Sequence, residues 1–428
     1  MSYGIITTGS RGDVQPFVAL ALALIHRGHD VTIVASENFK DFVEGFGIAF
    51  LPITGDSEHI INSPEALRLL EGGNVFKFLY HLLKISEQTA MQSNYDILHA
   101  CEGFDHLIVS VLPLPIVYSI AEKHHKKCCL VFLSLSPIPT REFPYQGLDF
   151  NIPSWLNKFS YRMLGVAYRM SSKQINQFRQ EIGLPPANVL KAILQSDTLA
   201  ILAESPELVK RPADWPPNAH VTGFFFLPPA AETTPSWDIP PQGLEDWLIA
   251  GDQPIYIGFG SIPIPNPAQF CAVLKGVLAK KRVVLGTGWS VLADLPQHPN
   301  LFVTKYIDHH WLLPRCCAAV IHGGIGTIAA TLKSGIPIIV VSILADQPIN
   351  GKFIERQKLG YHIPFKKLTT QKLLEAIDGT QNPELKERCR NMAARIRSEN
   401  GVEKAARLIE DYFEEKSRSV EPRSAKPG

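Results

Sequence analysis

Short apolar runs alternate with helix-length segments in both halves of this 428-residue chain, and this alternation constrains the fold more than any other feature. Near the start, apolar runs at residues 3–8 and 31–35 flank a segment that places Phe17, Leu20 and Leu24 on one helix face. Strands separated by helices pair in parallel, because a parallel connection needs a crossover of a dozen or more residues. The sequence therefore predicts an α/β chain.

The same alternation restarts after a proline-rich stretch. Residues 227–243 contain five prolines in 17 positions, which is typical of a stiff, extended connection. Beyond it, Tyr256–Ser261 repeats the pattern of Ile5–Ser10, an apolar strand that ends in glycine and serine. We therefore expect two Rossmann-like parallel-sheet domains that face a central cleft, with ligands beyond the carboxyl ends of the strands.

Domain boundaries follow from the same pattern. We expect an N-terminal domain at residues 1–227, a proline-rich linker at 228–243, a C-terminal domain at 244–400, a helix at 401–415 that packs back toward the N-terminal domain, and a disordered tail at 416–428.

Charge and composition exclude several classes of protein. Lys and Arg number 42 against 41 Asp and Glu, so no basic field is available for a nucleic-acid backbone. The chain has no apolar run of 18 residues that would span a membrane and no basic, apolar start typical of a secretory signal. The seven cysteines lack a C-x-x-C spacing and suit reduced thiols. These features favour a cytoplasmic location.

The strongest local motif is the glycine-rich turn at residues 320–327, between a predicted strand and a predicted helix. His322, Gly324, Gly326 and Thr327 combine close backbone approach, a helix N-terminus and two polar side chains, which suits a diphosphate. The turn is neither a Walker loop nor a G-x-G-x-x-G fingerprint. An alternative is a tight structural turn around a buried imidazole.

Two further strand ends carry polar residues. Ser261 follows the first strand of the second half and would point into the same cleft. Asp346 and Gln347 follow a later strand and can accept from and donate to sugar hydroxyls. An alternative for Asp346 is that it only caps the next helix.

Asp13 lies at the start of the first helix, on the side of the cleft. The alternative to a catalytic role is again a helix cap. Capping lowers the pKa of a carboxylate and makes it a weaker base. A carboxylate has more acceptor sites than one cap uses, so capping and catalysis are compatible.

Residues 143–170 are dense in aromatic side chains. This density fits either ordinary helix packing or the apolar wall of a pocket for a flat ligand. The residues are Phe143, Tyr145, Phe150, Trp155, Phe159, Tyr161 and Tyr168.

Together these segments resemble the nucleotide-sugar glycosyltransferases of family 1, which have the GT-B fold. The matching motifs are Tyr306–Pro314, His322–Thr327 and Ala345–Pro348, in the order of the family. The motif at residues 9–17 is similar to the branch that contains sterol 3-β-glucosyltransferases and the bacterial glycosyltransferases of antibiotic biosynthesis. The resemblance covers nearly the whole chain.

The resemblance implies that the N-terminal domain at 1–227 binds the acceptor and that the C-terminal domain at 244–400 binds the nucleotide-sugar donor. It also implies a role for each matching position. Asp13 would be the general base. Diphosphate contacts would come from Ser261, His322, Gly324, Gly326 and Thr327, sugar hydroxyl contacts from Asp346 and Gln347, and nucleobase or ribose contacts from Tyr306 and His309. Ala330 departs from the plant-type members, in which a Glu at this position binds the ribose. UDP and dTDP therefore both stay open, with UDP-glucose as our first choice.

We therefore expect an inverting, metal-independent glycosyltransferase. It would move a hexose, glucose from UDP-glucose in the first instance, to a hydroxyl of an apolar small molecule such as a sterol, terpenoid, flavonoid or lipid. The nucleotide sugar is a co-substrate, and we expect no other cofactor. Peripheral contact with a membrane stays open. The alternatives are a nucleotide-sugar epimerase on the same fold and a non-catalytic nucleotide-sugar-binding protein.

Overall fold

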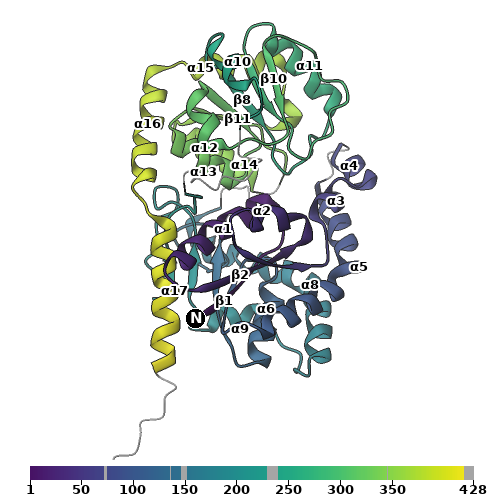
Figure 1. The fold of residues 1–428 in the computed structure, drawn as a ribbon, viewed down its shortest axis with the longest axis vertical. Coiled ribbons are helices and arrows are strands. Elements are labelled where there is room, and N and C mark those ends of the chain that lie inside the picture. The colour runs from purple at the N-terminus through teal and green to yellow at the C-terminus, as the bar shows by residue number, and fades with distance from the viewer. Residues whose placement is uncertain (72–74, 135, 146–151, 229–239, 345, 419–428) are drawn as a thin grey trace, which may run out of the picture.

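A computed structural model describes residues 1–71, 75–134, 136–145, 152–228, 240–344 and 346–418 of the chain. Two α/β domains lie one above the other along the long axis, the N-terminal domain in purple to teal and the C-terminal domain mainly in green (Figure 1). Most of the predicted linker, residues 229–239, lies outside the described residues, as do Phe150 and residues 419–428.

In the described part of the N-terminal domain, seven parallel strands form one sheet. Their bounds are β1 Ser2–Ile6, β2 Asp30–Ser36, β3 Ala49–Ile53, β4 His106–Val109, β5 Lys127–Phe132, β6 Ala200–Leu202 and β7 Ala219–Val221. Their order across the sheet is β3-β2-β1-β4-β5-β6-β7. Ile5 and Ile6 of β1 are fully buried in two different apolar clusters, one on each face. Burial on both faces explains why these strands are continuous apolar runs.

The described part of the C-terminal domain contains a six-stranded parallel sheet. The strands are β8 Ile255–Gly258, β9 Val283–Gly286, β10 Leu301–Thr304, β11 Ala318–Ile321, β12 Ile338–Val340 and β13 Gly360–His362. Their order is β10-β9-β8-β11-β12-β13. The predicted fold class, two parallel-sheet α/β domains, is confirmed. The prediction missed β6, β7 and β13, which have only three residues each.

Helices cover both faces of each sheet. The N-terminal domain has α1 Arg11–His26, α2 Lys40–Glu44, α3 Ser57–Ile61, α4 Pro64–Glu71, α5 Val75–Glu102, α6 Leu114–Lys123, α7 Asn157–Ser160, α8 Arg162–Glu181 and α9 Val189–Gln195. The C-terminal domain has α10 Leu244–Ile249, α11 Pro267–Leu278, α12 His309–Leu312, α13 Ile325–Ser334, α14 Gln347–Arg356, α15 Thr370–Gly379 and α16 Pro383–Arg397, and α17 Gly401–Arg418 ends the described chain.

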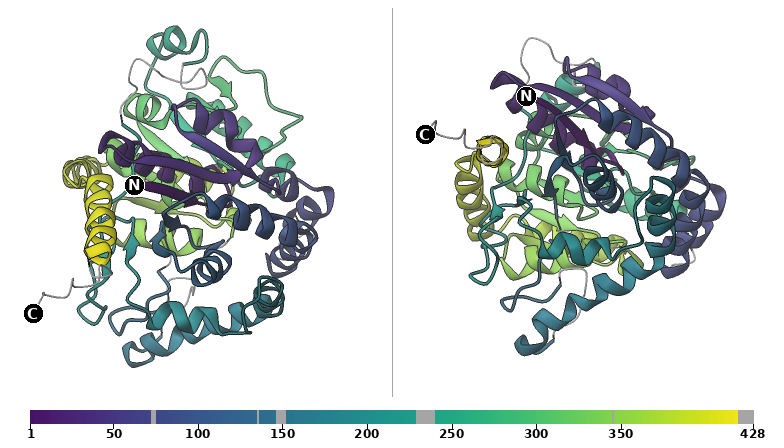
Figure 2. Two further views of the ribbon diagram at one scale, coloured as in Figure 1. Left: turned by 60° about the horizontal axis from the view of Figure 1, so that its bottom comes forward. Right: turned by 90° about the horizontal axis from the view of Figure 1, so that it is seen from below.

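The last two helices belong to different domains. Helix α16 packs against α13, and α17 then runs along the N-terminal domain beside α1 (Figures 1 and 2). Phe413 of α17 is fully buried and stacks on His106 with ring centroids 4.2 Å apart. Arg27 Nε of the N-terminal domain donates to Glu410 at 2.8 Å. The helix continues to Arg418, so the prediction of a disordered tail from residue 416 is wrong for its first three residues.

Strand order places one crevice in each sheet. In the first sheet the chain builds outward from β1 to β3 and then returns to β4 on the other side of β1. In the second sheet the same reversal falls between β8 and β11. Loops after the two strands diverge at such a point and leave room for a ligand at the carboxyl ends. Among the described helices, none is long and apolar enough to cross a membrane.

Candidate active site

A cavity of about 900 Å³ opens between the two domains at the carboxyl ends of both sheets. Every site residue that the sequence predicts lines this cavity. They are Asp13, Ser261, Tyr306, His309, His322, Gly324, Gly326, Thr327, Asp346 and Gln347. Topology explains the convergence, since Asp13 follows β1 while Ser261 and His322 follow β8 and β11, the strands at the two reversals of strand order.

Asp13 stands in the first turn of α1 and is held by the loop that precedes the helix. The backbone N–H of Ser10 donates to Asp13 Oδ2 at 2.7 Å, and the Ser10 hydroxyl donates to the same oxygen at 3.0 Å. Both bonds end on Oδ2 and leave Oδ1 for another partner. The carboxylate therefore caps the helix and still has an oxygen for chemistry.

The electrostatic setting of Asp13 differs from that of an exposed cap. Burial raises the pKa of its carboxyl, and the nearby Asp346 carboxylate adds to the rise, while the Ser10 bonds oppose it. The Ser10 bonds lower the pKa, as expected of a cap, but the net shift is upward. Burial has the larger effect because it removes water from the charged form.

The glycine-rich turn between β11 and α13 brings the backbone close to the cavity. Gly323 has a φ of +97°, and a Cβ there would lie 2.7 Å from Val340 Cγ1. A Cβ on Gly324 would lie 2.4 Å from His322 Nε2. Helix α13 begins at Ile325, so its first N–H groups come from the turn itself. This helix end can bind an anion.

His322 is almost fully buried beneath this turn. Burial lowers the pKa of its imidazole to about 4. The ring is therefore neutral at pH 7 and can donate one N–H toward the cavity. A Cβ on Gly260, after β8, would lie 3.2 Å from His322 Cε1, so the first loop of the domain packs directly on the ring.

Asp346 connects several parts of the site. Asn350 Nδ2 donates to Asp346 Oδ2 at 3.0 Å and to the carbonyl of Gly323 at 2.9 Å. The hydroxyl of Ser134, from the N-terminal domain, donates to the same carboxyl group. Asp346 occupies the cap position of α14, but its side chain makes no capping bond. The capping alternative is therefore wrong for the side chain.

Gln347 is less available than its sequence position predicts. Its Oε1 accepts the N–H of Ile343 at 2.8 Å and that of Leu344 at 3.1 Å. The two bonds use both lone pairs of this oxygen. Only the Nε2 hydrogens remain for a ligand, so in this pair Gln347 can donate to a sugar hydroxyl while the Asp346 carboxylate can accept.

Tyr306 and His309 differ in accessibility. The Arg11 guanidinium, from the N-terminal domain, lies 5.7 Å from the centroid of the Tyr306 ring, so this ring faces across the cleft. His309 Nε2 lies 2.9 Å from the hydroxyl of Tyr256, which is buried in β8. Burial lowers the pKa of His309 to about 3. Its remaining ring nitrogen is the group that a ligand can reach.

Apolar side chains of the N-terminal domain and of the segment after β7 also line the cavity, and two of the latter, Phe224 and Phe226, pack against the core of the C-terminal domain. The apolar side chains that line it include Phe46, Val131, Leu133, Leu164, Phe224, Phe225 and Phe226. Of the aromatic residues that the sequence places at 143–170, Tyr145 alone among the described ones lines this cavity. Tyr161 is buried, whereas Trp155 and Phe159 are exposed. Among the described aromatic residues of this segment, Tyr145 alone therefore fits the pocket-wall alternative.

Sequence reasoning missed three polar residues of the site. Two of them line the cavity, and the third, Asn350, holds Asp346. Ser134 follows β5 and Ser110 follows β4, and both line the cavity. The Ser110 hydroxyl is buried without a hydrogen-bond partner in the described structure. The one sequence signal for Asn350 is its position four residues after Asp346, which places both side chains on the same face of a helix.

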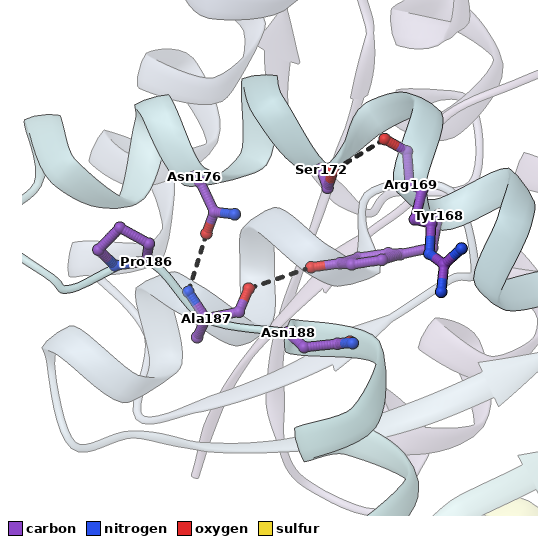
Figure 3. A pocket seen from close by; sticks show the side chains of 7 residues that line it. All are labelled: Tyr168, Arg169, Ser172, Asn176, Pro186, Ala187 and Asn188. Atoms are coloured by element: carbon purple, nitrogen blue, oxygen red, sulfur yellow. Dashed lines mark hydrogen bonds between the residues drawn. The ribbon is translucent and has the colours of Figure 1, made fainter.

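A second hollow, of about 360 Å³, lies between α8 and residues 186–188 (Figure 3). Ala187 N donates to Asn176 Oδ1 at 2.9 Å, and Val189 N donates to the Tyr168 hydroxyl at 2.9 Å. These groups hold the turn in place, and none of the predicted site residues lies here. Within the described residues, no group of three His, Cys, Asp or Glu side chains is placed to hold a metal ion.

Two family models match the chain in its two domains. Residues 3–102 match the glycosyltransferase family 28 N-terminal domain, and residues 283–410 match the erythromycin biosynthesis protein CIII-like C-terminal domain. Among solved structures, the glycotransferase of kitacinnamycin is similar with a TM-score of 0.69 and 18% identity over 96% of this chain and 98% of that one. A glycosyltransferase of Streptomyces sp. SF2575 complexed with thymidine diphosphate gives a TM-score of 0.61 at 18% identity over 96% and 99%.

Curated relatives include sterol and antibiotic enzymes. A sterol 3-beta-glucosyltransferase of Arabidopsis thaliana is 31% identical over 96% of this chain and 65% of its own length. The corresponding enzyme of Komagataella phaffii is also 31% identical, over 96% of this chain and 34% of its own. The O-mycaminosyltylonolide 6-deoxyallosyltransferase of Streptomyces fradiae is 28% identical over 99% of this chain and all of its own length. The chain thus spans about two thirds or less of the length of these sterol enzymes.

The two facing parallel-sheet domains with a ligand crevice between them are the GT-B fold. The chain belongs to the glycosyltransferase family of this fold, with sterol 3-beta-glucosyltransferases and antibiotic glycosyltransferases among its homologues.

Proposed function

We propose that this protein transfers a hexose from a nucleotide-sugar donor to a hydroxyl of an apolar acceptor, with inversion at the anomeric carbon. The observation that carries the proposal is the division of one cavity into two unlike halves. Glycine-rich backbone, a helix N-terminus and the polar groups of the C-terminal domain form one half, and apolar side chains of the N-terminal domain form the other. Asp13 lines the same cavity, and we assign it the role of general base for the reacting hydroxyl.

The donor half suits a nucleoside diphosphate sugar. The N–H groups at the start of α13, the neutral His322 ring and the hydroxyls of Thr327 and Ser261 would surround the diphosphate. Tyr306 offers a ring face for the base. The Asp346 carboxylate and the Gln347 amide would contact the sugar hydroxyls. UDP-glucose is our first choice, and a dTDP-sugar remains an alternative because Ala330, which lines the cavity, offers the ribose no carboxylate.

In the reaction, Asp13 takes the proton from the acceptor hydroxyl as its oxygen attacks the anomeric carbon. The new C–O bond forms as the bond to the diphosphate oxygen breaks, and the electron pair leaves with the diphosphate. The N–H groups of α13 and His322 gain strength as negative charge develops on that oxygen, which lowers the barrier. No step requires a metal ion.

Binding of the nucleotide sugar alone does not explain the apolar part of the cavity. An epimerase converts its nucleotide sugar without an acceptor and would not need the apolar lining that the N-terminal domain supplies, Phe46, Val131, Leu133 and Leu164. The same lining favours an acceptor with a large apolar surface over a sugar or a nucleoside.

The test is a mass-spectrometric screen of apolar hydroxyl compounds with UDP-glucose and dTDP-glucose in parallel. We expect a product heavier by one hexose and a β-linkage from an α-linked donor. Asp13→Asn should retain donor binding and lower turnover by roughly 10²–10⁴-fold. Conversion of UDP-glucose without acceptor would favour the epimerase. Stabilisation by UDP-glucose with neither transfer nor hydrolysis would favour a binding protein.

A further inference from the structure

The outer face of α7 and α8 carries a stripe of large apolar side chains that solvent reaches. Phe159, Met163, Val166 and Met170 are each between 48% and 61% exposed. Their spacing of four, three and four residues places them on one side of a helix. Trp155, one turn before Phe159, is 78% exposed and extends the stripe.

The opposite side of α8 belongs to the domain interior. Ile175 and Phe178 are buried in the apolar cluster beneath the sheet, and Leu164 lines the active-site cavity. Helix α8 lies at the outer edge of the N-terminal domain in both views of Figure 2. Single exposed apolar residues are common on protein surfaces, but several in register along one helix mark an interaction surface.

Basic side chains accompany the stripe. Arg162 and Arg169 immediately precede Met163 and Met170, and Lys173 follows by three residues; all three basic residues are exposed. Figure 3 shows Arg169 at the rim of the hollow beside α8.

Acidic residues are absent from this part of the sequence. Residues 152–180 contain no Asp or Glu, although the net charge of the whole chain is only +1. Asp214, from another segment, interacts with Lys158, so the variants below leave Lys158 unchanged. The positive charge is thus concentrated beside the apolar stripe.

This combination identifies the occupant. A helix with one apolar face and flanking Lys and Arg lies in the interface of a bilayer, with the apolar side chains among the acyl chains and the basic groups at the phosphates. Anionic lipids strengthen such binding. We propose that the face formed by Trp155, Phe159, Met163, Val166 and Met170, hereafter the docking face, binds a bilayer that contains anionic lipid.

The docking face also bears on acceptor delivery, and this part alone rests on the proposed function. Leu164 of the same helix lines the apolar half of the cavity. An apolar acceptor concentrates in a bilayer, so a docked α8 would place the cavity beside the acceptor's source.

The first test is co-sedimentation of the purified protein with vesicles of phosphatidylcholine, with and without phosphatidylglycerol. We expect wild-type protein to sediment mainly with the anionic vesicles. F159S/M163S/M170S and the charge reversal R162E/R169E/K173E should each weaken binding by roughly tenfold or more. The matched control is I249S/V291S, which removes two side chains that are 84% and 78% exposed in the C-terminal domain. It should bind as wild type, and thermal melts should show all variants folded.

Several results would overturn the proposal. Wild-type protein that sediments with neither vesicle would do so, as would unchanged binding by both triple variants or an equal loss in the control. A dimer in vesicle-free solution that F159S/M163S/M170S dissociates would assign the docking face to a second copy of the chain.

The second test separates docking from catalysis. With the acceptor found in the screen, the triple variants should transfer glucose at the wild-type rate in free solution and more slowly when the acceptor is embedded in anionic vesicles. Vesicle binding without transfer to any acceptor would contradict the proposed function and leave docking intact. Equal rates from vesicles for wild type and variants would contradict acceptor delivery.

Discussion

Gly9 and Asp13 share one small space at the end of β1. A Cβ built on Gly9 would lie 2.4 Å from Asp13 Oδ2, and Gly9 has a φ of +125°. Any side chain at Gly9 would therefore have to displace the carboxylate. The position of Asp13 thus depends on a glycine four residues earlier as well as on the helix that carries it.

Gly9→Ala should lower turnover nearly as much as Asp13→Asn, by roughly 10²-fold or more, because a displaced carboxylate cannot reach the acceptor hydroxyl. Binding of UDP-glucose should be retained. The matched control is Gly28→Ala at the other end of α1, where φ is +88° and nothing lies within 4 Å of the added Cβ. Gly28→Ala also places an alanine at a positive φ, which costs backbone strain, but it should keep full turnover. Normal turnover by Gly9→Ala would remove Asp13 from the mechanism.

Asp346→Asn should move the acid limb of the kcat/KM profile to lower pH. Turnover requires ionised Asp13, whose pKa is raised by burial and by the Asp346 carboxylate. Removing that negative charge lowers the pKa of Asp13, so activity persists to a lower pH. The maximum value of kcat/KM falls, because the contact between Asp346 and the sugar is lost. The exposed Asp30→Asn serves as the control for net charge. A limb that stays in place or moves to higher pH would contradict the claim that the Asp346 carboxylate raises the pKa of Asp13.

His322 should act as a neutral donor. Burial holds its pKa at about 4 in the free protein, so its contribution to donor binding should show no step near pH 6.5. UDP-glucose, which does not titrate there, is the ligand for calorimetry between pH 5.5 and 8. His322→Ala should reduce kcat by about 10²–10³-fold, as for loss of one preorganised donor to a developing oxyanion. Binding that tightens toward low pH with a midpoint near 6.5, and loses this dependence in His322→Ala, would contradict a neutral ring.

The sequence predicts those parts of the site that depend on local chain geometry. Asp13 and His322 follow strands directly, and parallel topology brings the carboxyl ends of strands to one edge whatever the details of packing. Ser134 could not be found in this way, because its contact with Asp346 joins two domains and leaves no local pattern.

The direction in which a side chain points is the other property that could not be predicted from the sequence. The aromatic density at 143–170 fits either helix packing or a pocket wall, yet Trp155 and Phe159 are exposed to solvent, while Phe224, Phe225 and Phe226 line the cavity. Gln347 turns its carbonyl oxygen to the backbone of Ile343 and Leu344, since the short strand β12 ends before them and leaves their N–H groups to be satisfied.

Glu204→Gln should stabilise the protein at neutral and higher pH. Glu204 follows β6, is 4% exposed, and its Oε2 has no hydrogen-bond partner in the described structure. Burial, with a smaller contribution from Asp346, raises its pKa to about 8 from 4.5. Between these values the folded protein keeps a proton that the unfolded chain releases, so the free energy of unfolding falls as pH rises through this range, by about 1.4 kcal/mol per pH unit.

Denaturant titrations of wild type and Glu204→Gln at pH 5 and pH 8 measure this effect. The two proteins should have nearly the same free energy of unfolding at pH 5, and at pH 8 the variant should be more stable by an amount on the order of a few kcal/mol. The exposed Glu245→Gln is the control and should follow wild type at both values. A difference that does not grow with pH would mean that Glu204 titrates normally and that water or another group reaches its carboxylate.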